Sequence, residues 1–363
     1  TEPPRLRGGR NRTHWCRYGL PAAGLWLRFN AEMSHHRAPE ASSASWMRAA
    51  EHAAAALRAP GDGARAVVLA AAGLQRLEDS DDARTESLHD AGVRALSAQG
   101  LQHAGLEDAC RMYPRLLAGS GRGRKRAGAW YTPEWLVREV LDGLLEGLAD
   151  AAGDGRAAGP GAARPLRVLD PAAGAGAFLL GAAEAAAARG APVLLYGIDS
   201  DPVACALCRA RLAAAGLEAD ILWGDALAGT LEHWGTAGAV GPQRAARTTP
   251  AANPGGAPPA WRAGVFHDAD AAGGFDAAIG NPPFLNQTRK ATARTGTRDG
   301  AAARSLLGEA VGGTQDAAAG FLVLGLRVAR EGGAVAMVQP ASVLGSAGAR
   351  RARAWASGRA RLE

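Results

Sequence analysis

The sequence predicts an α/β fold, with a doubly wound, mostly parallel sheet preceded by a helical domain. Four short apolar runs of strand length indicate the sheet, at residues 166–169, 193–198, 219–223 and 275–279. Each run ends in a loop of small or polar residues, and alanine-rich stretches of helix length follow the first two. Further alanine-rich helices are expected before the sheet, for example at 45–58 and 84–98.

The loop after the first strand, residues 170–178, has the composition of a ligand-binding turn. It reads Asp-Pro-Ala-Ala-Gly-Ala-Gly-Ala-Phe, and such small residues let the backbone approach a ligand closely. A helix is expected at 178–188, which completes the strand–loop–helix unit of a nucleotide site in an open α/β sheet. Leu179 stands where a dinucleotide-binding loop would have its third glycine, so NAD and FAD are disfavoured.

Acidic residues end the next two strands. Asp199 is placed to accept hydrogen bonds from both hydroxyls of a ribose. Asp201 is the expected N-cap of the following helix, with Pro202 at the first helical position. Asp225 and Ala226 follow the third strand, where the carboxylate could accept from the amino group of a cofactor's adenine. Loops in this order are typical of a site for S-adenosylmethionine.

The fourth strand ends in the turn Asn281-Pro282-Pro283-Phe284. The prolines fix the backbone and remove two N–H donors, which leaves the Asn281 side-chain oxygen and the Pro282 carbonyl as rigid acceptors. Phe284 adds a flat apolar face. This combination suits a planar ring with an exocyclic amino group, such as adenine, or a glutamine amide if stacking is dispensable.

With these loops in this order, the chain resembles the gamma class of adenine-N6 DNA methyltransferases. Tyr131-Thr132-Pro133 is similar to the family motif that caps the methionine end of the cofactor. Segments 316–321 and 332–342 are similar to later family motifs, so the resemblance covers residues 105–358. The helical stretch 106–117 and the Arg-rich 121–128 resemble the connector of type IIG restriction–modification enzymes and related phage-defence methylases.

The resemblance implies a class I S-adenosylmethionine-dependent methyltransferase that methylates the N6 amino group of an adenine flipped out of double-stranded DNA. The catalytic residues it implies are Asn281, Pro282 and Phe284. The expected cofactor-binding residues are Tyr131, Thr132, Pro133, Asp170, Ala172, Gly174, Gly176, Phe178, Asp199, Asp225, Ala226 and Asn281. The expected DNA-binding residues, in a basic loop after the turn, are Arg289, Lys290, Arg294 and Arg298.

Two other functions remain open at this point. A methyltransferase acting on ribosomal RNA or on a protein glutamine would share the Asn-Pro-Pro turn, although Tyr131-Thr132-Pro133 argues against both. A fragment that binds cofactor without transferring a methyl group is the other alternative.

The composition sets the broad class. The net charge of +6 and the pI of about 9.6 permit nucleic-acid binding, but Lys125 and Lys290 are the only lysines, so biased arginine usage explains the charge equally well. No apolar run is long enough to span a membrane, and a prokaryotic cytoplasmic location is expected. Cys205-x-x-Cys208 lacks the further ligands that zinc needs, so no metal is expected.

The predicted domains are a poorly ordered Arg/Pro/Gly-rich segment at 1–40, a helical connector at 41–120 and a catalytic domain at 121–363, with a low-complexity insertion at 230–264. Family members continue into two more strands and a target-recognition domain. We therefore expect this chain to be a fragment whose C-terminal strands are missing. A nuclease or specificity domain or partner is expected outside it.

Overall fold

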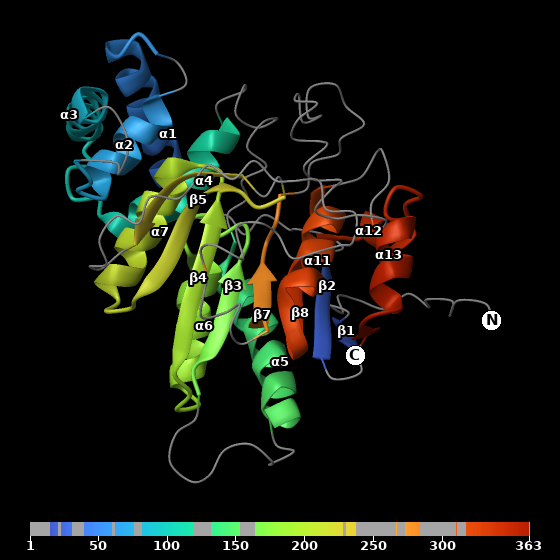
Figure 1. Cartoon of the computed structure of the whole chain (residues 1–363). Coiled ribbons are helices and arrows are strands. Elements are labelled where there is room, and N and C mark those ends of the chain that lie inside the picture. Colours follow the sequence, from blue (N-terminus) through green and yellow to red (C-terminus); the bar gives the residue numbers. More distant parts are fainter. Residues whose placement is uncertain are drawn as a thin grey trace.

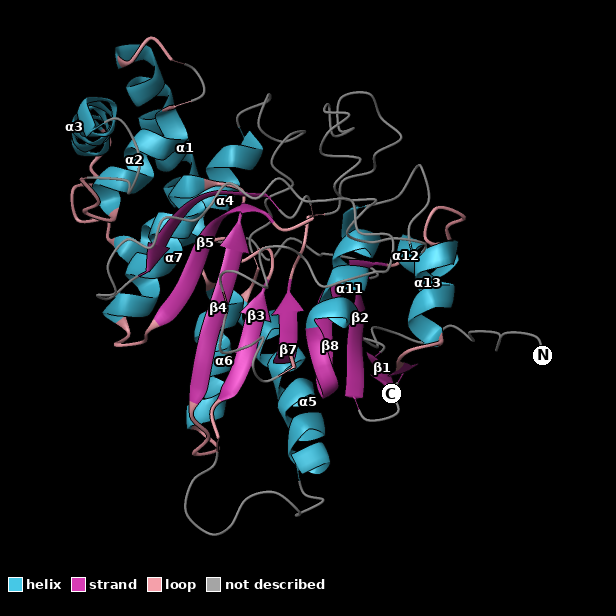
Figure 2. Cartoon of the chain, viewed as in Figure 1, coloured by secondary structure: helices cyan, strands magenta, loops and turns pink. Residues whose placement is uncertain are grey.

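The computed structural model of the chain describes residues 15–20, 23–30, 40–59, 62–75, 82–119, 132–152, 164–227, 230–236, 266, 273–283, 310 and 317–362. Within these ranges, nine strands form one sheet in the order β1-β9-β2-β8-β7-β3-β4-β5-β6 (Figure 1). Helices cover both faces of the sheet, as Figure 2 shows.

Five parallel strands make the centre of the sheet. They are β3 (Leu166–Asp170), β4 (Val193–Asp199), β5 (Ala219–Asp225), β7 (Phe275–Gly280) and β8 (Ala329–Pro340). The chain runs outward from β3 through β4 to β5, and then returns to the other side of β3 with β7 and β8. The predicted doubly wound α/β fold is therefore confirmed. Its topological switch point lies between β3 and β7, where ligands of such sheets bind.

Each face of the sheet has its own hydrophobic core. One face is covered by α5 (Glu134–Ala152), α6 (Ala177–Ala187) and α7 (Pro202–Ala214), and its core includes Val140, Phe178 and Leu195. The other face is covered by α11 (Ala317–Val328) and α13 (Arg350–Ser357), with the short α12 (Ser342–Gly345) beside them. Both faces of the central strands are thus buried, which explains their nearly continuous apolar sequence.

Four helices precede the five central strands in sequence and pack together at one side of the sheet. They are α1 (Glu40–Ala56), α2 (Gly63–Ala71), α3 (Asp82–Ala98) and α4 (Leu106–Gly119). Their shared core, which includes Trp46, Leu69 and Tyr113, continues into α7 of the sheet domain (Figure 1). The helical domain is therefore joined to the sheet through α7.

The two edges of the sheet differ from the sequence-based expectation. Strands β1 (Trp15–Leu20) and β2 (Ala23–Asn30) lie in the segment expected to be poorly ordered, and β2 pairs in parallel with β8. The sheet therefore continues beyond β8, through strands from the N-terminal part of the chain. The two-residue β9 (Arg361–Leu362) pairs with β1 and β2. At the far edge, β6 (Thr230–Thr236) pairs antiparallel with β5, inside the expected insertion. The physical reason is that an unpaired β8 or β5 would expose a row of backbone donors and acceptors.

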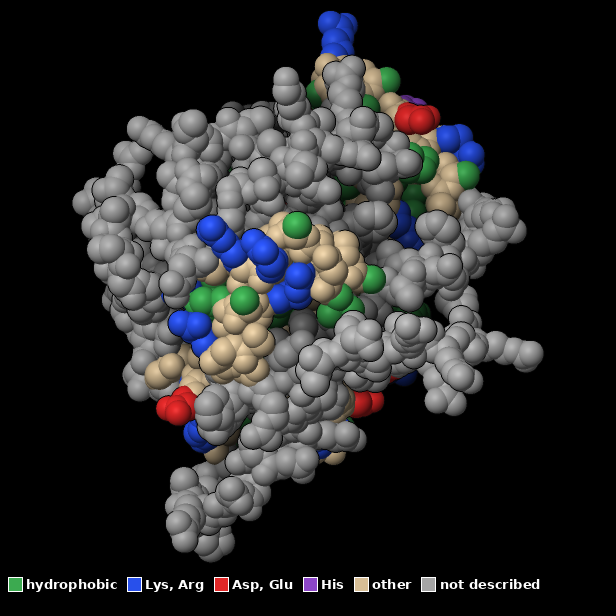
Figure 3. Space-filling view, turned by 90° about the vertical axis from the view of Figure 1, so that its right-hand side faces the viewer, with side chains coloured by type: hydrophobic (Ala, Val, Ile, Leu, Met, Phe, Trp, Pro, Cys, Tyr) green, Lys and Arg blue, Asp and Glu red, His purple; other side chains and the backbone are tan. Residues whose placement is uncertain are grey.

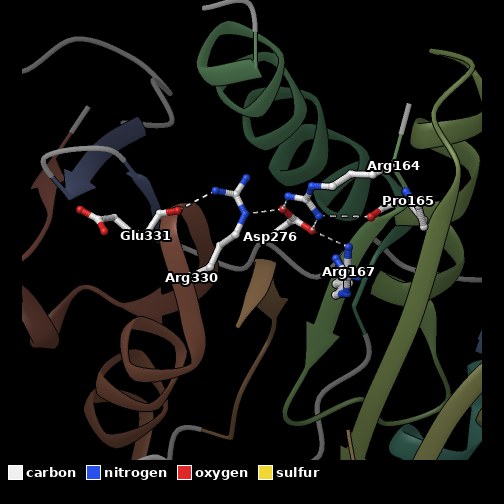
Figure 4. A network of polar contacts seen from close by, with 6 residues as sticks. All are labelled: Arg164, Pro165, Arg167, Asp276, Arg330 and Glu331. Carbon is white, nitrogen blue, oxygen red and sulfur yellow. Dashed lines mark hydrogen bonds and ion pairs between the residues drawn. The ribbon is translucent and has the colours of Figure 1, made fainter. Parts of the chain in front are cut away.

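A buried ionic network ties the amino ends of three central strands together (Figure 4). Asp276 on β7 is 0% exposed and accepts hydrogen bonds from both terminal nitrogens of Arg164, from Nε of Arg330 and from the backbone N–H of Arg167. Burial alone would raise the pKa of Asp276, but these hydrogen bonds outweigh it and hold the pKa below its usual value. The network lies at the end of the sheet opposite the carboxyl-end loops.

None of the helices in the described part of the chain combines the length and apolarity needed to cross a bilayer.

Candidate active site at the carboxyl end of the sheet

The loop after β3 is shaped for close approach. Gly174 and Gly176 both have left-handed backbones, with φ of 54° and 79°. No described atom lies within 4 Å of where a Cβ on Gly174 would stand, whereas a Cβ on Gly176 would come within 2.8 Å of the Cys208 sulfur. Gly176 is thus required by the packing of α6 on α7, and Gly174 leaves the loop open toward a ligand.

Asp199 fastens this loop to the end of β4. One carboxylate oxygen accepts from the backbone N–H of Gly174 at 2.8 Å, and the other accepts from that of Asp201 at 2.9 Å. Burial, with the negative charge of Asp201, raises the pKa of Asp199 to about 6. The backbone N–H of Ser200 also bonds this carboxylate, and the acceptor capacity that remains could serve a hydroxyl group.

Asp170 lies beneath the switch point and is 1% exposed. Its Oδ1 accepts from the backbone N–H of Ala172 at 3.0 Å, which is the loop-capping geometry. Burial, together with the charge of Asp199, raises its pKa to about 8. A Cβ on Gly280 would come within 2.6 Å of the same Oδ1, so Asp170 also contacts the residue before the Asn-Pro-Pro turn. The two carboxylates together make a site that would favour a cationic ligand.

The Asn-Pro-Pro turn meets the Thr-Pro segment before α5. The amide nitrogen of Asn281 donates to the hydroxyl oxygen of Thr132 at 3.2 Å, across 149 positions of sequence. The amide oxygen of Asn281 is buried, and no described residue gives it a hydrogen bond. Since an unpaired buried acceptor is unfavourable by about 1–3 kcal/mol, this oxygen is a feature that needs a functional explanation.

Other expected site residues lie as follows. Pro133 directly precedes α5, which begins at Glu134, and the turn residue Pro282 is buried. Asp225 caps its own turn by accepting from the backbone N–H of Leu227 at 2.9 Å, and Ala226 is buried in the core. Phe178 differs from the expectation of a cofactor contact, because it is 2% exposed and packs in the core of α5 and α6. The residues that lie outside the described ranges are Tyr131, Phe284, Arg289, Lys290, Arg294 and Arg298.

Sequence reasoning missed Gln339, which lies at the carboxyl end of β8. Its exposure is 0%, and both the oxygen and the nitrogen of its amide are buried without a partner in the described part of the chain. Gly280 pairs with Met337, so Gln339 stands two residues further along the neighbouring strand, level with Pro282. The available signal was a single amide that follows the apolar run 334–338 and directly precedes a proline.

The cysteines have structural surroundings. Cys110, Cys205 and Cys208 are free and buried, and burial raises the pKa of the Cys110 thiol to about 12. The Cys205 sulfur lies 3.5 Å from the carbonyl oxygens of Asp199 and Leu222, which share its one S–H donor. Within the described residues, no group of three or more His, Cys, Asp or Glu side chains is placed to hold a metal ion.

Part of the chain is similar to known restriction–modification methylases. Residues 194–362, just under half of the chain, match the family model of the Eco57I restriction-modification methylase. Over 96 residues the chain is 35% identical to the Type II methyltransferase M.XamI of Xanthomonas campestris pv. amaranthicola. The aligned segment covers 26% of this chain and 15% of that protein. The match thus spans a small part of that relative's length.

Two solved structures show a weaker likeness. One, from Listeria monocytogenes, is classed as a class I S-adenosylmethionine-dependent methyltransferase, with a TM-score of 0.43 and 13% identity over 88% of this chain and 79% of the other. The second is a modification subunit assigned to a type I restriction enzyme of Vibrio vulnificus YJ016, with a TM-score of 0.38 and 19% identity over 74% and 46%. The fold assignment rests on the strand order of the sheet itself. The family match and the relative confirm the resemblance to restriction–modification methylases that the motifs indicate.

Proposed function

We propose that this chain contains the catalytic domain of a DNA methyltransferase that transfers a methyl group to the N6 amino group of adenine in a restriction–modification or phage-defence system. The observation that carries the proposal is the buried, unpartnered amide oxygen of Asn281. The amide nitrogen of Asn281 already donates to Thr132, so the amide oxygen is the atom available to a substrate. A buried acceptor held in one orientation suits a substrate that donates an N–H.

The chemistry asked of the turn is modest. The lone pair of an adenine amino nitrogen is delocalised into the ring, which makes the nitrogen a weak nucleophile. Two acceptors, the Asn281 oxygen and the Pro282 carbonyl, would hold its two hydrogens and favour a tetrahedral nitrogen with an available lone pair. Acceptors fixed in advance stabilise the positive charge that develops on nitrogen, and no general base is needed before transfer.

The residues of the site fit S-adenosylmethionine, which when bound supplies an electrophilic sulfonium methyl group. Asp199 would accept from the ribose hydroxyls, and the open backbone at Gly174 would lie against the ligand. The buried carboxylate of Asp170 and the part-buried carboxylate of Asp199 suit the cationic cofactor, whose positive charge would relieve their mutual repulsion. The segment around Thr132, at the amino end of α5, is where its methionine carboxylate would find N–H groups.

A DNA substrate fits the charge of the chain. We infer phosphate contacts from Arg289, Lys290, Arg294 and Arg298, and stacking of a flipped adenine on Phe284, which would contribute about 1–3 kcal/mol. In addition, cationic side chains gather on one face of the molecule (Figure 3), where α13 carries the exposed Arg350 and Arg351.

The test is to express the gene that encodes this chain in cells that lack adenine methylation, beside an Asn281→Ala variant. Nucleoside analysis of the DNA should find 6-methyladenine with the wild-type protein and a loss of about 10²–10³-fold or more with the variant, on the scale of removing one preorganised polar contact. Calorimetry should find cofactor binding nearly unchanged in the variant. Methylation that persists in Asn281→Ala, or loss of its cofactor binding, would contradict the role given to this residue. Absence of 6-methyladenine with soluble wild-type protein that binds cofactor would redirect the search to RNA or protein substrates.

A further inference from the structure

A tyrosine of the helical domain is hydrogen-bonded to the cofactor end of the sheet domain. Tyr113, on α4, is 2% exposed, and its hydroxyl donates to Oδ2 of Asp201 at 2.7 Å. Arg65 on α2 hydrogen-bonds the same tyrosine and attracts Asp201 electrostatically. The contact spans 88 positions of sequence, and it joins the helical domain to the residue that starts α7.

Asp201 passes this contact on to the candidate cofactor site. Its Oδ1 caps α7 by accepting from the backbone N–H of Val203 at 3.0 Å, which fixes its side chain. Its own backbone N–H donates to Oδ1 of Asp199 at 2.9 Å. The other oxygen of Asp199 holds the backbone of Gly174 at 2.8 Å. A continuous path therefore runs from Tyr113 through Asp201 to Asp199 and the open loop.

The apolar contacts follow the same path. Val203, Ala204 and Leu207 of α7 belong to the hydrophobic core of the helical domain, and Ala175 of the loop after β3 packs against that core. The helical domain thus contacts both segments that hydrogen-bond Asp199, namely the start of α7 and the loop after β3.

We propose that Tyr113 is a positioning residue for the cofactor-binding carboxylate, so that the helical domain takes part in cofactor affinity through Asp201 and Asp199. The inference rests on the proposed function, since it takes Asp199 as the group that binds the ribose hydroxyls. Tyr113 itself contacts no substrate in this scheme. Without this hydroxyl, the Asp201 side chain has one hydrogen bond fewer. The backbone N–H of Asp201, which bonds Asp199, is then held less firmly in its orientation.

The first experiment measures binding of S-adenosylmethionine to the full chain by calorimetry, for wild type and Tyr113→Phe. We expect the dissociation constant of the variant to rise about tenfold, the scale of one hydrogen bond to a charged group. The matched control is Glu107→Gln, which breaks the ion pair between Glu107 and Arg211 at the exposed rim of the same domain contact, 65% exposed on the Glu107 side. That variant should bind the cofactor as wild type does.

A second ligand separates positioning from general loosening. An S-adenosylmethionine analogue that lacks both ribose hydroxyls cannot use Asp199, so wild type and Tyr113→Phe should bind it equally. Equal weakening of both ligands, or unchanged binding of S-adenosylmethionine, would overturn the inference. If Tyr113→Phe does not fold, Arg65→Gln is the second variant, because Arg65 hydrogen-bonds the same hydroxyl and its side chain is 40% exposed. It must weaken binding of S-adenosylmethionine by a smaller factor and leave binding of the analogue unchanged. A wild-type chain that binds neither ligand would count against the proposed function instead.

Discussion

Replacing Asp276 by asparagine should lower the free energy of unfolding by about 3–5 kcal/mol, because Asp276 is 0% exposed and its carboxylate is the anion that the whole network shares. The carboxylate accepts four hydrogen bonds, and hydrogen bonds to a charged group contribute about 1.5–3 kcal/mol each. The contribution of Arg164 must be discounted because its side chain is 49% exposed and screened by water. Arg330, at 28% exposed, and the backbone N–H of Arg167 supply most of the remainder.

The asparagine variant keeps the shape of the side chain but turns one acceptor into a donor. Its NH₂ group would face guanidinium or backbone N–H donors, and two cationic side chains would lose their counter-charge. The assay is urea denaturation followed by circular dichroism. The matched control is Asp142→Asn, the same chemical change in the 3.8 Å pair with Arg189, where Asp142 is 66% exposed and about 0–0.5 kcal/mol is expected. A value for Asp276→Asn within about 1 kcal/mol of wild type would refute the reasoning.

The pH dependence of this contribution has a defined sign. The folded state holds the pKa of Asp276 below the unfolded value of about 3.9, so the folded state binds fewer protons in that range. The contribution is therefore complete above about pH 4 and is lost as the pH falls through the folded pKa. Asp276→Asn should remove this part of the acid sensitivity.

Two further predictions concern the opposite end of the sheet. Asp170 has its pKa raised to about 8, so the folded state binds more protons than the unfolded chain between about pH 4 and pH 8, and stability should fall as the pH rises through this range. Asp170→Asn should flatten that fall in urea titrations at several pH values, and an unchanged slope would contradict the assignment. Gln339→Leu removes two buried polar atoms that have no partners, so its unfolding free energy should be unchanged or higher by about 1–3 kcal/mol, and a loss of more than about 1 kcal/mol would mean that the amide is satisfied in solution.

The centre of the fold was predictable because each signal in it is local. Apolar runs bounded by turn-forming residues predicted the bounds of β3, β4, β5 and β7 to within two residues. Asp201 followed by Pro202 predicted the start of α7. Loops after parallel strands gather at one edge of the sheet, so the meeting of Gly174 with Asp199 also followed from sequence order.

The contacts that sequence reasoning missed join residues far apart in the chain. Asp276 has partners 54, 109 and 112 positions away, and neither an arginine nor an aspartate announces which counter-charge it will meet. The Tyr113–Asp201 bond is of the same kind. Strand β2 was missed because residues 1–40 were judged by their Arg, Pro and Gly content, while residues 23–30 carry leucine and aromatic residues that favour a strand beside β8.

The two ends of the sheet place buried polar groups in opposite energetic situations. At the amino end, Asp276 is fully paired and its pKa is lowered. At the carboxyl end, Asp170 and Asp199 have raised pKa values, and the amides of Asn281 and Gln339 keep unpaired atoms. Asp276 and Gln339 are 0% exposed and Asp170 is 1% exposed, so the difference between these three side chains lies in their partners. A fold under selection for stability alone would pair these groups or replace them, because unpaired buried polar atoms are unfavourable.

This contrast leads to a crossed expectation. Variants at the amino end, such as Asp276→Asn, should lower stability and leave the cofactor affinity of the folded protein unchanged. Variants at the carboxyl end, such as Asp170→Asn at pH 8, should preserve or raise stability and lower the affinity for the cofactor. Measuring both quantities for both variants tests the division directly. If Asp170→Asn lowered stability as much as Asp276→Asn and left binding intact, the carboxyl end would be ordinary core, and the functional explanation of its unpaired groups would fail.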